Sequence, residues 1–87
     1  MTTRSQIAGW FDRGVAQGAT HMIVKWDSFE GPFDADYPVY VMPGEDPREI
    51  DRQNGDRTVE CYNLRLNRDS QLAEYRAFHW ETDEVPA

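Results

Sequence analysis

The sequence predicts an α+β fold, with a small three-stranded, mainly antiparallel sheet packed by an N-terminal helix and a C-terminal helix. Apolar residues near the N-terminus recur at helical spacing, which predicts the first helix. Three later stretches rich in β-branched and aromatic residues predict the strands. The 87 residues are enough for a single domain. We expect residues 1–80 to form that domain and residues 81–87 to form a flexible acidic tail.

The first predicted element is a helix over residues 3–17. Its inward face carries an apolar stripe at i, i+3, i+4 spacing, made of Ile7, Trp10, Phe11, Gly14 and Val15. Thr3 or Ser5 suits the start of this helix, and Gly18 suits the left-handed position that ends one. Because Gly14 lies on the apolar stripe, we expect another element to pack closely against it.

Residues 21–29 and 37–42 are the first two predicted strands, joined as a hairpin. One face of the first strand is wholly apolar and the other is mixed, a pattern typical of an antiparallel sheet with one covered face. Pro38 cannot donate a ladder hydrogen bond. The second strand is therefore expected at an edge of the sheet, or Pro38 at the start of the strand.

A short helix is predicted next, with Asp46 as its cap, Pro47 in its first turn and Asn54-Gly55 at its end. Its single clearly apolar residue, Ile50, indicates a solvated connector.

Residues 58–66 are the third predicted strand, with Val59 and Cys61 on the face opposite to Tyr62. A helix from 69 to about 77 with an extended segment after it is favoured next, although residues 75–80 also alternate like a strand, which leaves both alternatives open there. The predicted core consists of Ile7, Trp10, Phe11, Met22, Val24, Trp26 and Leu64.

The charge balance excludes several classes of partner. Sixteen acidic and nine basic residues give a formal net charge of −7. Direct binding to a nucleic acid or to an anionic membrane is disfavoured because both would repel the chain. A basic protein surface would instead be attracted and steered toward it. The sequence has neither an apolar signal core nor an apolar run of membrane-spanning length, so we expect a cytosolic protein.

Residues 27–36 read D-S-F-E-G-P-F-D-A-D and contain no Lys or Arg. The carboxylates of this loop are Asp27, Glu30, Asp34 and Asp36. They are solvated, bind a cation or face a basic partner, and the sequence leaves these alternatives open. Their spacing does not match that of a calcium-binding loop. We therefore predict neither a metal site nor a cofactor.

Catalytic chemistry has little support in the sequence. A thiol–imidazole pair would need Cys61 to meet His21 or His79 in the fold. A lone cysteine within a strand is more typical of a buried, inert thiol. No serine lies in a nucleophile-elbow pattern. We predict a protein that is not an enzyme, without catalytic residues.

Aromatic residues and arginines are concentrated in the segment R-A-F-H-W at 76–80. Aromatic rings can stack on a base and arginine can bind a phosphate, although such rings also fill small cores. An alternative function is therefore capture of a small nucleotide signal at a homodimer interface, since pairing would also stabilise so small a domain. The ligand contacts would then be Arg76, His79, Trp80 and Tyr40.

Three segments, T-H-M-I-V-K-W-D-S-F at 20–29, D-Y-P-V-Y-V at 36–41 and R-A-F-H-W at 76–80, are similar to a group of small uncharacterised proteins from bacteria and their phages. The group has no established activity, so the resemblance implies no functional residues. By analogy with small acidic phage-type proteins, it implies a counter-defence factor that mimics nucleic acid or sequesters a nucleotide signal.

The main functional prediction is a non-enzymatic acidic binding protein that inhibits a basic, nucleic-acid-binding partner by stoichiometric capture. Its carboxylates would imitate phosphates. The predicted partner-binding residues are Asp27, Glu30, Asp34, Asp36, Glu45, Asp46, Glu49 and Asp51.

Overall fold

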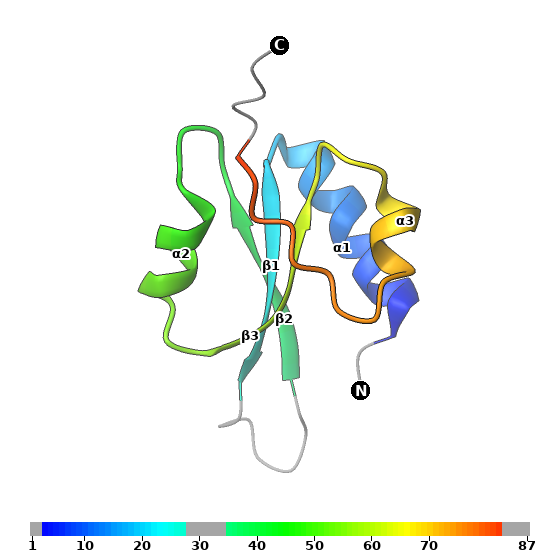
Figure 1. Ribbon diagram of the computed structural model, residues 1–87, viewed down its shortest axis with the longest axis horizontal. Helices are drawn as coiled ribbons and strands as arrows, with labels where there is room; N and C mark the ends of the chain where they lie inside the picture. Colours follow the sequence, from blue (N-terminus) through cyan, green and yellow to red (C-terminus); the bar gives the residue numbers. More distant parts are fainter. Residues whose placement is uncertain (1–2, 28–34, 83–87) are drawn as a thin grey trace.

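The computed structural model describes residues 3–27 and 35–82 and has the predicted α+β architecture (Figure 1). Three antiparallel strands lie in the order β2-β1-β3. The elements are α1 (Arg4–Gln17), β1 (His21–Asp27), β2 (Ala35–Val41), α2 (Pro47–Gln53), β3 (Arg57–Asn63) and α3 (Arg68–Leu72). Helices α1 and α3 lie on one side of the sheet and α2 on the other. None of the helices in these ranges has the length and apolar composition needed to cross a membrane.

Helix α1 begins and ends as its sequence predicts. The Thr3 side chain accepts a hydrogen bond from the backbone N–H of Gln6 (3.1 Å), and the Gln6 side chain accepts one from the backbone N–H of Thr3 (2.9 Å). This capping box satisfies two backbone donors that the helix itself leaves unpaired. Gly18 ends the helix with φ of 81°, a conformation that costs glycine little.

Gly14 allows α1 to approach the sheet closely, as its place on the apolar stripe predicts. A Cβ atom at this position would lie 2.7 Å from Leu64 Cδ1 and 2.7 Å from Tyr40 Cε1. Gly9, on the exposed side of the same helix, has open space at the corresponding point. Close packing of α1 therefore requires a glycine at position 14 but not at position 9.

We expect Gly14→Ala and Gly9→Ala to change stability in opposite directions. Alanine favours a helix over glycine by about 1 kcal/mol, which Gly9→Ala should gain in full. At Gly14 that gain is outweighed by overpacking, which typically costs about 1–3 kcal/mol. Urea unfolding of both variants measures the difference. Equal stabilisation by the two substitutions would contradict the close contact at Gly14.

Both faces of the sheet are covered, so the prediction of a single covered face is wrong. The larger core, beneath α1, contains Ile7, Phe11, Ala19, Met22, Val24, Tyr62, Leu64 and Ala77. Trp10 only packs against its margin, and Trp26 is half-buried and outside it, although both were predicted core residues. The smaller core, on the α2 side, contains Ile23, Val41 and Cys61.

Helix α2 is therefore not a solvated connector. Ile50 packs against the smaller core and Pro47 is fully buried. The buried Lys25 side chain also forms an ion pair with Asp51, on the inward side of the same helix. One apolar contact, a buried proline and a buried ion pair together dock α2 on the sheet.

Strand β3 contains a bulge that changes the predicted faces. Val24 lies opposite Glu60, but the next residue, Lys25, lies opposite Thr58. Val59 is the extra residue, as expected where two residues of one strand oppose one of its partner. It packs against the core beneath α1 instead of sharing the face of Cys61. The strand also ends at Asn63, earlier than predicted, and Leu66 lies half-exposed beyond it.

The C-terminal segment forms a short pairing with β3 where a longer helix was predicted. Helix α3 ends at Leu72, and Phe78 forms a parallel bridge with Cys61. The Cys61 N–H donates to the Ala77 carbonyl (2.8 Å), and the His79 N–H donates to the Cys61 carbonyl (2.9 Å). This pairing covers the outer edge of β3.

The opposite edge of the sheet belongs to β2, with Pro38 in the middle of the strand. The prediction of an edge strand is thus confirmed. The folded part of the chain extends beyond residue 80, because the Glu81 carbonyl accepts hydrogen bonds from His21 and Asn63. The rest of the predicted tail, residues 83–87, lies outside the described residues, and the predicted homodimer stays a prediction.

Candidate functional site

The eight carboxylates predicted to bind a partner do not lie on one surface. Asp27 and Asp36 lie at the lower end of the sheet in Figure 1, where β1 ends and β2 begins. Glu45 and Asp46 follow the last residue of β2 and so lie at the upper end. Glu49 and Asp51 are on α2. Glu30 and Asp34 lie outside the described residues.

The carboxylates at and after the upper end have local structural partners. Glu45 accepts a hydrogen bond from the Met42 backbone N–H (2.8 Å). Asp46 caps α2 by accepting one from the Arg48 N–H (3.0 Å). Glu49 pairs with Arg52 one turn along the same helix (2.9 Å). Turn formation and capping account for these acidic residues without an external partner.

Asp51 is a structural residue as well. Its Oδ1 lies 2.6 Å from the Nζ of Lys25, the only lysine in the chain, which is 1% exposed. The Lys25 ammonium also donates to the Thr58 hydroxyl (2.9 Å), and that hydroxyl donates to Asp51. A buried ammonium needs such partners because transfer from water to the interior is costly. Asp51 therefore balances an internal charge.

Asp56, which the sequence analysis did not single out, belongs to the lower end of the sheet. The Tyr37 hydroxyl donates to its Oδ2 (2.5 Å), and Asn54 Nδ2 donates to the same hydroxyl (3.1 Å). The hydrogen bond to Asp56 is the main reason that the pKa of Tyr37 is raised, since ionisation of the phenol would remove it. The pairing of β1 with β2 on one side and with β3 on the other thus brings Asp56, which precedes β3, beside a tyrosine distant in sequence.

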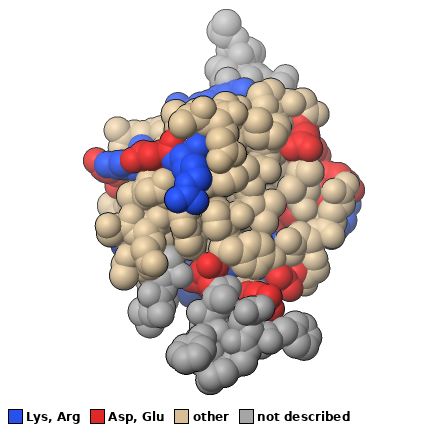
Figure 2. Space-filling view, turned by 180° about the vertical axis from the view of Figure 1, so that it is seen from behind, with Lys and Arg blue, Asp and Glu red and all other residues tan. Residues whose placement is uncertain are grey.

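We call the carboxylates Asp27, Asp36 and Asp56 the hairpin end. They come from three different segments at the lower end of the sheet, and Asp36, opposite Trp26 in the register, points to the other face of the sheet from Asp27. Figure 2 shows acidic side chains near the lower edge of the molecule and others at its left and right margins, with a largely uncharged area between them. The basic residue Arg57, which directly follows Asp56, lies at the same end of the sheet, over the Trp26 ring at 5.8 Å.

The four residues of the alternative ligand site are not brought together. Tyr40 packs toward α1, where its hydroxyl donates to the Trp10 carbonyl (2.8 Å). Trp80 packs on the other face of the sheet. Arg76 lies over the exposed Tyr75 ring at 5.6 Å. The remaining residue, His79, pairs with Glu74 through Nε2 (2.8 Å).

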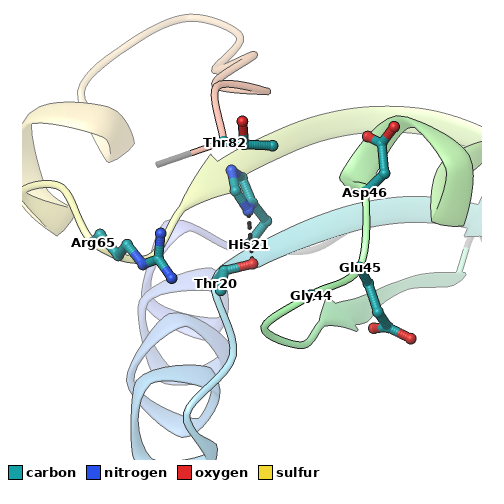
Figure 3. Close-up of a pocket in the computed structure, with 7 residues that line it drawn as sticks. All are labelled: Thr20, His21, Gly44, Glu45, Asp46, Arg65 and Thr82. Carbon is teal, nitrogen blue, oxygen red and sulfur yellow. Dashed lines mark hydrogen bonds between the residues drawn. The ribbon is translucent and has the colours of Figure 1, made fainter. Parts of the chain in front are cut away.

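A hollow of about 370 Å³ lies at the upper end of the sheet (Figure 3). Its lining residues are Thr20, His21, Gly44, Glu45, Asp46, Arg65 and Thr82. His21 Nε2 donates to the Glu81 carbonyl (2.6 Å), and Nδ1 is hydrogen-bonded to the Thr20 hydroxyl (2.9 Å). Its two carboxylates are already engaged, Glu45 in the turn after β2 and Asp46 in the cap of α2. The polar groups of this hollow therefore serve mainly to hold the local structure.

The fold keeps Cys61 apart from acid–base chemistry. Its side chain is fully buried, and Sγ donates to the His79 carbonyl (3.6 Å) instead of meeting an imidazole. Burial raises the pKa of the thiol to about 12, with smaller contributions from Asp51 and Glu81. The thiolate, which is the nucleophilic form, is therefore scarce in the folded protein near neutral pH.

We expect iodoacetamide at pH 8 to label Cys61 only after unfolding. Because folding raises the pKa of this thiol, the thiol contributes to the free energy of unfolding. This contribution is fully present below the pKa of the unfolded thiol, about 8.5, and is lost as the pH rises toward about 12. Mass spectrometry with and without urea measures labelling. Complete labelling of the folded protein within minutes would contradict an inert thiol.

No group of three or more His, Cys, Asp or Glu side chains suited to a metal ion occurs within residues 3–27 and 35–82. A scan against models of protein families and searches of curated proteins and of solved structures found no match to the chain.

Proposed function

We propose that the protein is a non-enzymatic binding domain that captures a partner protein through its hairpin end. The observation that carries this proposal is the position of Asp27, Asp36 and Asp56, from three segments of the chain, at one end of the sheet. Backbone pairing between β1 and β2 holds the first two, and Tyr37 holds the third. Their charges are thus presented on a sheet end with limited freedom, which favours specific recognition.

The partner should carry a basic surface of the kind that binds nucleic acid. The net charge of −7 attracts such a surface over a distance, and the carboxylates would stand in place of phosphates. The internal pairing of Lys25 with Asp51 keeps the only lysine from offsetting the acidic end. The resemblance to small phage proteins suggests a nuclease complex as the partner, with counter-defence as the biological role.

Affinity capture with matched variants tests the proposal. Asp27→Asn with Asp36→Asn removes two charges from the hairpin end. Asp12→Asn with Asp69→Asn removes two exposed charges that both pair with Arg68, between α1 and α3. Each pair changes the net charge by the same amount, so the comparison separates the position of the lost charges from the overall charge.

We expect the wild-type protein and the Asp12/Asp69 variant to retain the same basic protein from a lysate of the source cell. The Asp27/Asp36 variant should retain much less of it, and salt should release it, since screening shortens the reach of surface charges. Quantitative mass spectrometry measures the retained amounts. Equal retention by both variants, or retention that salt does not affect, would remove the hairpin end from the proposed function.

A further inference from the structure

A second hollow, of about 240 Å³, lies between α2 and the C-terminal segment. It is lined by Arg48, Phe78, Trp80 and Glu81. Within the described residues, this hollow and the hairpin end share no residue. Of the four residues that the sequence predicted to bind a small ligand, Trp80 alone lines this hollow. The other three lining residues were not predicted as ligand contacts.

The wall formed by the C-terminal segment is held in place by backbone hydrogen bonds. Cys61 binds the segment through both its N–H and its carbonyl (2.8 and 2.9 Å). The Glu81 carbonyl accepts hydrogen bonds from His21 (2.6 Å) and Asn63 (3.3 Å). The aromatic side chains between these anchors therefore have fixed backbone positions, a preorganisation that lowers the entropy lost on binding.

The side chains around the hollow offer three kinds of contact. Phe78 is 49% exposed, so one large apolar ring faces solvent although its backbone is anchored. The Arg48 guanidinium lies over the Trp80 ring at 5.0 Å, a contact that orients the group and leaves its N–H donors at the rim. Glu81 adds a carboxylate whose side chain is 62% exposed and lies 3.9 Å from His79.

These contacts match a flat ring that has an anionic group on one side and N–H donors on another. A ring can stack on an aromatic side chain, arginine binds phosphate oxygens, and a carboxylate accepts from N–H groups. The volume is below the roughly 300–1,000 Å³ of sites for drug-sized ligands, which suits a single base. Guanine is favoured because its amino group and adjacent ring N–H can both donate to one carboxylate.

We propose that the hollow between α2 and the C-terminal segment binds a purine nucleoside monophosphate, preferably that of guanine. The base stacks on Phe78, the phosphate accepts hydrogen bonds from Arg48, and Glu81 accepts from the guanine N–H groups. Binding here does not depend on the hairpin end, so either proposal can fail while the other holds.

Titration of the full chain with GMP, followed by NMR and calorimetry, tests this site. We expect GMP to shift the indole N–H signal of Trp80, assigned with Trp80→Phe. Guanosine, which lacks the phosphate, and IMP, which lacks the amino group, should each bind more weakly. Phe78→Ala should weaken GMP binding about tenfold, since the base loses its stacking contact with the aromatic ring.

Matched variants assign the polar contacts. Arg48→Gln should reduce the affinity for GMP to that for guanosine, and Glu81→Gln should remove the preference for GMP over IMP. Arg52→Gln, an exposed arginine on the same helix that pairs with Glu49, serves as the control and should leave binding unchanged. All these side chains are at least partly exposed, and circular dichroism verifies that each variant is folded.

Three results would overturn the proposal. GMP could fail to shift the Trp80 signal at millimolar concentration. Inorganic phosphate could bind as tightly as GMP, which would show a simple anion site. Arg48→Gln could bind GMP like the wild type, which would exclude the assigned phosphate contact.

Discussion

Replacing Asp51 with Ala should lower the free energy of unfolding by about 3–5 kcal/mol, the cost of leaving one partner of a buried ion pair uncompensated. The Lys25 side chain is 2% exposed and, among the described residues, would keep the Thr58 hydroxyl and the Asp51 backbone carbonyl as acceptors. Domains gain roughly 0.05–0.15 kcal/mol of stability per residue, so the loss is a large share of the total. Urea unfolding followed by circular dichroism measures it.

A second substitution separates this effect from a general loss of packing. Lys25→Met combined with Asp51→Ala removes both charges and should be more stable than Asp51→Ala alone, because the unpaired ammonium is gone. Glu49→Ala, which removes an exposed ion pair on the same helix, should cost less than about 1 kcal/mol. Similar losses for Asp51→Ala and Glu49→Ala would show that Lys25 is not buried as described.

Replacing Glu60 with Ala should lower the free energy of unfolding by about 2–4 kcal/mol. This carboxylate is 3% exposed and accepts from Arg4 Nη1 (3.1 Å), the Tyr62 hydroxyl (2.7 Å) and the Ala77 N–H (3.2 Å). Without it, two buried donors lose an acceptor, each at a cost of about 1–3 kcal/mol. Arg4 is partly exposed, so its guanidinium can turn to water.

The Glu60 carboxylate connects α1 to the C-terminal segment, because Arg4 also donates to the carbonyls of Glu74 and Tyr75. Arg68 links α1 to α3 through exposed carboxylates and provides the control. Arg68→Ala should cost less than about 1 kcal/mol. Hydrogen exchange of the Ala77 N–H should accelerate in Glu60→Ala and remain slow in Arg68→Ala. An unchanged exchange rate in Glu60→Ala would contradict the connection.

Apolar periodicity and turn chemistry predicted the fold class, the order of the elements and most of the first core. They failed at α2, because a helix with Ile50 as its only clear apolar residue looks solvated. Its docking depends on the Lys25–Asp51 ion pair, which joins residues 26 positions apart in sequence. A pattern that counts apolar residues cannot detect a buried pair of opposite charges.

The candidate site was predicted less well, for a related reason. An acidic run in the sequence identified Asp27 and Asp36, but Asp56 joins them only through the sheet register and the Tyr37 hydroxyl. The second hollow likewise forms only because Phe78 pairs with β3 and brings its neighbours next to Arg48 on α2. Pairing between distant segments, which no local pattern encodes, creates both surfaces.

The association rate with the captured partner tests the central functional claim most directly. Surface plasmon resonance at low and at high salt should show the wild type and the Asp12/Asp69 variant associating equally fast, with rates that fall as salt rises. The Asp27/Asp36 variant should associate about tenfold more slowly at low salt, since steering accelerates association by about 10–10³. Identical rates for all three proteins at both salt concentrations would contradict an acidic hairpin end that recognises a basic partner.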